Sequence, residues 1–237
     1  MSLRPSTVLA LLGVLLLSAS ACRRPSRADQ MRRDMYVKDS LQYVQALRTR
    51  AYSDSLLQTL LPTVNPLLAQ FRYEKEEGYE DHGRYVHRQL VTDRNTARNY
   101  LQAYVTDDAR LVLQSFYYGA RPLEQRALRI AVEEGFQEAE GTNHSFEAEG
   151  RHELLSLTPD DSQRLLGLVA SHSQQRVRVT LVGKREQVYY LQTNEKQALT
   201  ETLQLAKLMQ DIASLERSVR TADRQIEKHQ RKHGMKE

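Results

Sequence analysis

Glycine and proline are distributed very unevenly along this chain, and their placement limits which parts can form long helices. Residues 26–61 contain neither, and residues 184–233 contain neither. The segment between them, 62–183, holds eight of the ten glycines. Because glycine and proline interrupt helices and mark turns, we expect long helices towards both ends and turn-rich structure in the middle.

The first glycine-free segment carries an apolar stripe. Its members recur at spacings of four, three and three: Val37, Leu41, Val44 and Leu47. This is the period of one face of a helix. We therefore predict a helix that ends at Pro62, and we expect its stripe to be covered by a partner helix.

The last glycine-free segment has a heptad pattern. Apolar residues recur every seven positions: Leu205, Ile212, Val219 and Ile226. Three residues after the first three of them come Leu208, Leu215 and Ala222. Such an a/d seam predicts a coiled-coil-like helix that must bury the seam against another helix. Two partners are open: the N-terminal helix, paired antiparallel as a stalk, or the same helix of a second copy in a homodimer.

The middle segment alternates in the manner of strands. Leu101, Ala103 and Val105 alternate with polar or amphipathic residues, and Val177–Val182 behaves likewise. Short connections such as Asp107-Asp108 indicate antiparallel pairing. One helix interrupts the strands, with Thr158 as its cap and a proline in its first turn. We predict an α+β fold, in which an antiparallel domain of about eight strands and one helix is flanked by two long helices.

The amino terminus has the pattern of a secretory signal. Arg4 supplies a positive charge, an apolar run follows over residues 8–17, and small residues precede Cys22. A charged start, a short apolar stretch and small residues before a cleavage site describe a signal peptide. The apolar run is much shorter than the roughly 20 residues of a membrane-spanning helix. The alternatives are an uncleaved anchor and an ordinary cleaved signal with an incidental cysteine.

The signal resembles the lipobox of bacterial lipoproteins in its last five residues, Ser18-Ala19-Ser20-Ala21-Cys22, with Ala19 where leucine is commonest. The resemblance covers residues 1–22. It implies that the thiol of Cys22 is acylated, that the preceding residues are removed, and that membrane lipid holds the protein in the bacterial cell envelope. In that family an aspartate directly after the cysteine marks retention in the inner membrane. Arg23 stands there in this chain, so the resemblance implies the outer membrane.

These patterns divide the chain into four parts. They are a signal peptide (1–21), an anchor with the N-terminal helix (22–61), an antiparallel β domain (62–193) and a coiled-coil-like C-terminal helix (194–237). Five basic residues of the last part share one helix face, which we expect to lie near anionic headgroups: Arg217, Arg220, Arg224, Lys228 and Arg231. The net charge of +4 is modest, so we expect no nucleic-acid partner.

No catalytic signature is present in the sequence, and we predict no catalytic residue, cofactor or metal site. His82 and His87 lie five residues apart, and a strand would point such residues to opposite faces, so we do not expect them to bind a metal together. We expect both to be exposed turn residues. His229 and His233 fall on the heptad seam and are expected to be polar seam residues. His152-Glu153 lacks the second histidine of an HExxH motif.

Tyrosines are frequent in the predicted β domain, and Tyr100 and Tyr104 share one strand face. Tyrosine is enriched where proteins bind, so we take this pair as the possible binding residues. Our leading hypothesis is a non-enzymatic envelope lipoprotein that binds an unidentified envelope protein or has a structural role. The alternative is a carrier that holds a hydrophobic ligand in the β domain. An envelope hydrolase or metalloenzyme has the least support.

Overall fold

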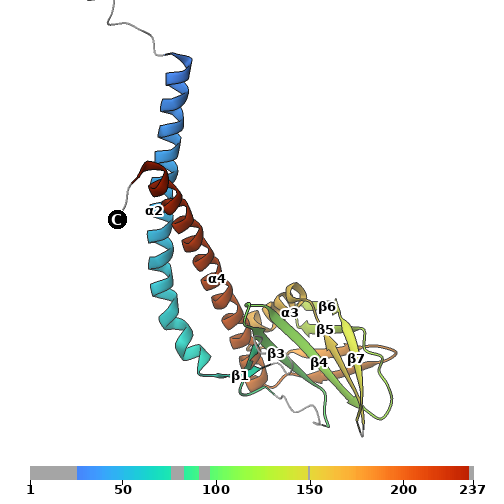
Figure 1. Cartoon of the computed structure of the whole chain (residues 1–237). Helices are drawn as coiled ribbons and strands as arrows, with labels where there is room; N and C mark the ends of the chain where they lie inside the picture. Colours follow the sequence, from blue (N-terminus) through green and yellow to red (C-terminus); the bar gives the residue numbers. More distant parts are fainter. Residues whose placement is uncertain (1–25, 76–82, 91–96, 149, 235–237) are drawn as a thin grey trace, which may run out of the picture. The chain divides into compact units, whose positions relative to one another are not determined.

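The computed structural model describes residues 26–75, 83–90, 97–148 and 150–234. These residues form three helices and ten strands (Figure 1), which confirms the α+β class. The chain divides into two compact units. Of the described residues, the smaller unit combines those up to Ala51 with those from Arg220 onwards, and the larger unit is Tyr52–Val219. Helices α2 (Arg27–Leu68) and α4 (Thr193–His233) contribute to both units.

The strands form two antiparallel sheets in the larger unit. The first sheet has the order β1 (Phe71–Lys75), β2 (Gly83–His87), β3 (Tyr100–Thr106), β4 (Leu111–Gly119), β8 (Gly150–Ser156) and β7 (Thr142–Ala148). The second has the order β10 (Glu186–Tyr190), β9 (Arg178–Val182), β5 (Ala127–Val132) and β6 (Gly135–Glu140). The predicted count of about eight was low, because residues 127–156 contribute four strands.

Helix α2 (Arg27–Leu68) is longer than predicted, because it continues through Pro62 and Pro66. A proline inside a helix costs about 3 kcal/mol. Packing offsets this cost: Val64 is buried in the main core of the larger unit, with Leu67 and Leu68 packed against it. The expectation that Pro62 ends the helix was therefore wrong.

The cap of helix α3 (Pro159–Ser171) agrees with the prediction. The hydroxyl of Thr158 accepts a hydrogen bond from the Asp161 amide at 3.2 Å. Helix α4 (Thr193–His233) begins one residue before the predicted Asn194. There the side chain of Glu195 accepts a hydrogen bond from the Gln192 amide at 2.9 Å, which satisfies one of the donors exposed at a helix start.

The core of the larger unit joins the two sheets, α3 and the start of α4. Leu113, Leu128 and Leu165 are completely buried in one cluster, together with Ala198 and Leu199 of α4. The first turns of α4 therefore belong to the core of this unit. The compact unit accordingly extends over Tyr52–Val219, whereas the glycine and proline pattern predicts limits at 62 and 193.

Candidate functional site

Within the smaller unit, α2 and α4 pack side by side in antiparallel directions (Figure 1). Tyr43 stacks on His229, with ring centroids 4.3 Å apart. Further along α2, Ala46 is buried with Ala222 and Ile226. Residue numbers thus rise along α2 as they fall along α4, which is the antiparallel pairing that the stalk hypothesis requires.

The pairing face of α2 also carries one carboxylate that contacts several residues of α4. Oδ2 of Asp39 lies 2.7 Å from Nε2 of His233, 3.0 Å from Nζ of Lys232 and 3.2 Å from Nδ1 of His229. Hydrogen bonds from His233 and then Lys232 lower the pKa of Asp39 to about 2. The carboxylate is therefore ionised at neutral pH and electrostatically holds α2 to α4.

The opposite face of α2 is apolar and uncovered. Val37 is 55% exposed, Leu41 65% and Val44 42%. Each lies two positions before a residue of the pairing face, which turns it by about 200° around the helix axis. Three of the four residues of the predicted apolar stripe therefore face away from α4, and the fourth, Leu47, is 40% exposed. The expectation that α4 covers the stripe was wrong. We call Val37, Leu41 and Val44 the outward stripe.

A shallow surface groove of about 410 Å³, bounded by α2 alone and open to solvent, follows this stripe. It is lined by Val37 and Leu41 together with Asp34, Lys38, Gln42 and Gln45. Exposed Arg33 and Arg48 lie on the same side of the helix, one at each end of the stripe. The outward face thus combines a narrow apolar seam with flanking charges that are mostly positive.

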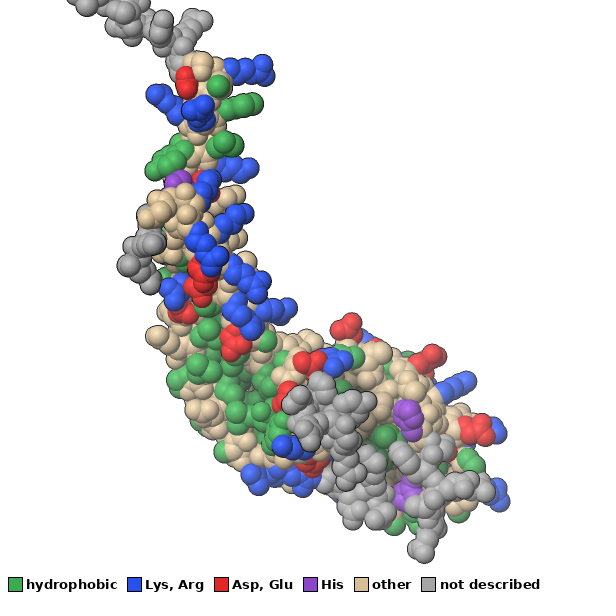
Figure 2. Space-filling view, viewed as in Figure 1, with side chains coloured by type: hydrophobic (Ala, Val, Ile, Leu, Met, Phe, Trp, Pro, Cys, Tyr) green, Lys and Arg blue, Asp and Glu red, His purple; other side chains and the backbone are tan. Residues whose placement is uncertain are grey.

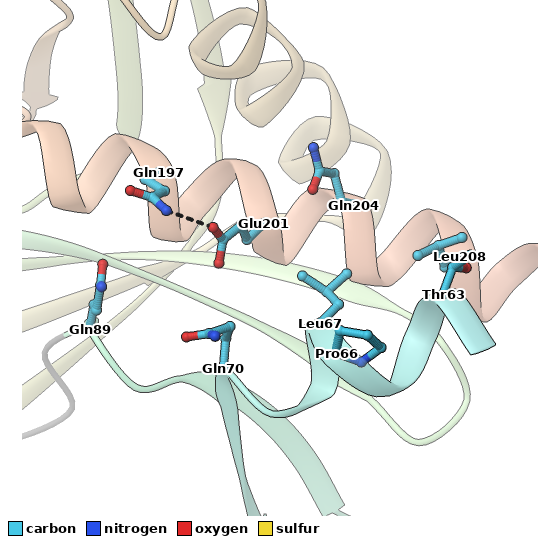
Figure 3. Close-up of a pocket in the computed structure, with 9 residues that line it drawn as sticks. All are labelled: Thr63, Pro66, Leu67, Gln70, Gln89, Gln197, Glu201, Gln204 and Leu208. Atoms are coloured by element: carbon cyan, nitrogen blue, oxygen red, sulfur yellow. Dashed lines mark hydrogen bonds between the residues drawn. The ribbon is translucent and has the colours of Figure 1, made fainter. Parts of the chain in front are cut away.

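The larger unit contains a polar pocket of about 460 Å³, between the end of α2 and α4 (Figure 3). Glu201 of α4 points into it and accepts a hydrogen bond from Gln197 at 2.8 Å (Figure 3). Its other oxygen lies 2.8 Å from Nε2 of His87, whose Nδ1 accepts a bond from the Gln89 amide. His87 is only 1% exposed, so the prediction of an exposed turn residue was wrong; His82 lies outside the described residues.

The two tyrosines chosen from the sequence have different environments. Tyr100 is 2% exposed and stacks on Phe116, with ring centroids 4.4 Å apart. It packs inside the domain and offers almost no surface to a partner. Tyr104 is partly buried, and the Arg84 guanidinium lies 5.0 Å from its ring centroid. A binding role for Tyr104 stays a prediction.

The other sequence-based sites are exposed or lie outside the described residues. All five residues of the basic face are exposed: Arg217, Arg220, Arg224, Lys228 and Arg231. Figure 2 shows Lys and Arg side chains projecting from the helices. Arg231 also forms an ion pair with Glu227 at 3.1 Å. Cys22 lies outside the described residues. The membrane roles of Cys22 and the basic face stay predictions.

Sequence reasoning missed the pairing face of α2 because its members are chemically mixed. The face consists of Asp39, Tyr43, Ala46 and Arg50, at spacings of four, three and four; Arg50 forms an ion pair with Asp223 of α4 at 2.9 Å. Only two of the four residues are apolar or aromatic. One usable signal was present in α4, where His229 and His233 lie four residues apart and therefore on the same helix face.

Among the described residues, no helix is both long and apolar enough to cross a membrane. Comparison of the chain with protein-family models, with curated proteins and with solved structures finds no significant match.

Proposed function

We propose that this protein is a lipid-anchored, non-enzymatic protein of the bacterial envelope that binds a helix of another protein along the outward stripe of α2. The anchor rests on the lipobox-like residues that end at Cys22. The binding surface rests on one observation. Three large apolar side chains at spacings of four and three stay 42–65% exposed on a helix whose other face already packs against α4.

The energetics favour coverage of this stripe. Complete burial of a valine or leucine side chain contributes about 1.5–3 kcal/mol. Covering what remains exposed of Val37, Leu41 and Val44 then contributes on the order of 1 kcal/mol each. Spacings of four and three match the seam along which one helix packs on another, so a helix is the shape that fits.

Charge favours an acidic partner over a second copy. The groove residue Lys38 and the exposed Arg33 and Arg48 outnumber Asp34 on this face. Two copies packed through the stripe would bring these cations towards one another, and like charges across an interface are unfavourable. A helix with an apolar seam and glutamates or aspartates beside it would complement both features.

The β domain gives less support to the carrier alternative. The side chains that face the space between the sheets are completely buried and pack in one cluster. They include Leu113, Leu128, Ile130, Leu155, Val179 and Leu181. Interiors of this kind are close-packed, so a hydrophobic ligand would have to displace side chains of the core.

Site-specific photo-crosslinking in native membranes tests the proposal. A photoreactive amino acid at Leu41 should crosslink to one envelope protein. The same amino acid at Gln225, an exposed residue of α4 in the same unit, should not. Leu41→Glu should abolish the crosslink obtained from a probe at Val44 without lowering the thermal unfolding midpoint, because Leu41 is exposed.

Three outcomes would contradict the proposed partner. A crosslinked product of twice the protein's mass would identify a second copy. Crosslinking to lipid would identify the membrane surface as the occupant. Equal crosslinking from positions 41 and 225 would mean that the stripe is not a specific surface.

A further inference from the structure

We propose that Asp39, His229 and His233 form a binding site for a divalent transition metal ion of the zinc class, which bridges α2 and α4. The three residues each offer one ligand atom, and these atoms all lie within 4.8 Å of one another. Two imidazole nitrogens and one carboxylate oxygen are a ligand set that zinc uses, whereas magnesium and calcium prefer oxygen ligands.

The helices place these ligands through simple geometry. His229 and His233 are separated by four residues of α4, so their rings project from one side of that helix with centroids 4.3 Å apart. Asp39 comes from the face of α2 that packs against this side. A metal ion would therefore hold together two segments that are 190 residues apart in the sequence.

The clearest sign of an incomplete site is the Nδ1 atom of His229. It is buried and has no hydrogen-bond partner among the residues that the structure describes, and His229 as a whole is only 9% exposed. Buried polar atoms normally have a partner. Oδ2 of Asp39 is 3.2 Å from this nitrogen, but the contact lacks the geometry of a hydrogen bond. A metal ion between the two atoms would satisfy both.

The distances need only small adjustments. Zinc bonds to nitrogen and oxygen of about 2.0–2.2 Å place the ligand atoms of a tetrahedron roughly 3.3–3.6 Å apart. The separations from Asp39 Oδ2 to His233 and His229 are 2.7 and 3.2 Å, so these two would each widen by less than an ångström. The ligand nitrogens of the two histidines lie within 4.8 Å of each other, so they would approach by at most about 1.5 Å. The remaining coordination position is then open to water.

Lys232 is the competitor for this site. Its ammonium group lies 3.0 Å from Oδ2 of Asp39, and its side chain is 57% exposed. Because a long exposed side chain can turn into solvent, the ion would replace Lys232 at the carboxylate. The site lies on the pairing face of α2, on the side away from the outward stripe, so it shares no residue with the proposed partner surface.

Zinc titration of the full-length Cys22→Ser protein tests the site, since this variant removes a thiol that could also bind zinc. Calorimetry should show one equivalent of zinc bound, and zinc should raise the thermal unfolding midpoint. His229→Ala, His233→Ala and Asp39→Asn should each weaken binding by at least about tenfold. Lys232→Met should strengthen it. The control His172→Ala, in the larger unit, should bind as the parent does.

Circular dichroism at 25 °C without zinc establishes that each variant keeps its helix content. Zinc binding that is unchanged in His233→Ala and in His229→Ala would overturn the proposal, and so would the absence of zinc binding by the parent protein. Equal weakening in His172→Ala would also overturn it, because the effect would then not be specific to the site. Loss of partner crosslinking with intact zinc binding would contradict only the proposed function.

Discussion

Glu153 of β8 is the buried carboxylate on which the connection between the two sheets depends. It is 2% exposed. Oε1 accepts hydrogen bonds from the amides of Leu123 at 2.7 Å and Glu124 at 2.9 Å. Oε2 accepts from the Gln125 amide at 2.7 Å and from the Asn143 side chain at 3.2 Å. The three amides belong to residues 123–125, in the connection that carries the chain from β4 in the first sheet to β5 in the second.

Substitution of Glu153 should therefore lower the free energy of unfolding, and the loss should grow with the number of donors left without a partner. Each buried donor that loses its partner costs about 1–3 kcal/mol. Glu153→Ala removes the partners of two fully buried amides, those of Leu123 and Gln125, so we expect a loss of about 2–6 kcal/mol. Glu153→Gln keeps one acceptor oxygen and turns an NH₂ group towards the remaining donors, which predicts a loss of about 1–3 kcal/mol.

Urea unfolding monitored by circular dichroism would measure both losses. The matched control is Glu138→Gln, since Glu138 forms an ion pair with Arg129 at 2.6 Å but is about one-third exposed. Such surface pairs contribute about 0–1 kcal/mol. If Glu153→Gln were as stable as the wild type to within about 0.5 kcal/mol, or less damaging than the control, the assigned role of both oxygens would be refuted.

Four further predictions follow from individual residues. Cys22→Ser should release the protein from the membrane fraction at an unchanged unfolding midpoint, and continued tight association would contradict acylation at this residue. Ala46→Leu should overpack the helix pair, in which Ala46 is 1% exposed, and cost about 1–3 kcal/mol; unchanged hydrogen exchange over residues 220–233 would argue against the pairing face. Gly167→Ala should stabilise α3 by about 0.5–1 kcal/mol, because a Cβ there meets nothing within 4 Å. Gly183→Ala should destabilise the protein, because its Cβ would collide with the Leu123 carbonyl; thermal melts that rank the two variants in reverse would contradict this. Arg164 first, and then Thr158, lower the pKa of Asp161, so this carboxylate stabilises the fold at neutral pH and the contribution is lost as pH falls below 3.8; urea unfolding should show an advantage over Asp161→Asn at pH 7 that shrinks in acid.

Local signals were reliable where one short segment decides the structure. The cap at Thr158 and the Asp107-Asp108 turn both depend on residues within a few positions, and both are present in the structure. Strand β6 gave no such signal. Its segment Gly-Phe-Gln-Glu-Ala-Glu buries only Ala139, so it lacks the apolar alternation by which a strand is recognised.

Tertiary packing decided what the sequence pattern could not. The first turns of α4 bury a broader face than an a/d seam, and a face of this breadth is typical of a helix buried in a domain core. The buried residues are Ala198, Leu199, Leu203, Leu205 and Ala206. The heptad pattern continues through Ile226 and therefore predicts one seam for the whole helix. For α2, hydrophobic periodicity identified an actual stripe but not the direction in which it points, because the pairing face depends on Asp39 and Ala46.

An ordinary surface helix buries its large apolar residues, whereas α2 exposes Val37, Leu41 and Val44 and packs a chemically mixed face against α4. This arrangement affects the stability of the helix pair. The buried apolar residues of the helix pair are Ala46, Ala222 and Ile226, which remove little area from water. Apolar burial therefore contributes little to pairing. The remaining contacts include those of Asp39, the stacking of Tyr43 on His229 and the ion pair between Arg50 and Asp223. A ligand that binds only the paired state stabilises it by mass action. If the partner also binds only when α2 is held against α4, zinc binding and partner binding are coupled, and the coupling is reciprocal. Zinc at the pairing face and a helix on the outward stripe would then each strengthen the binding of the other.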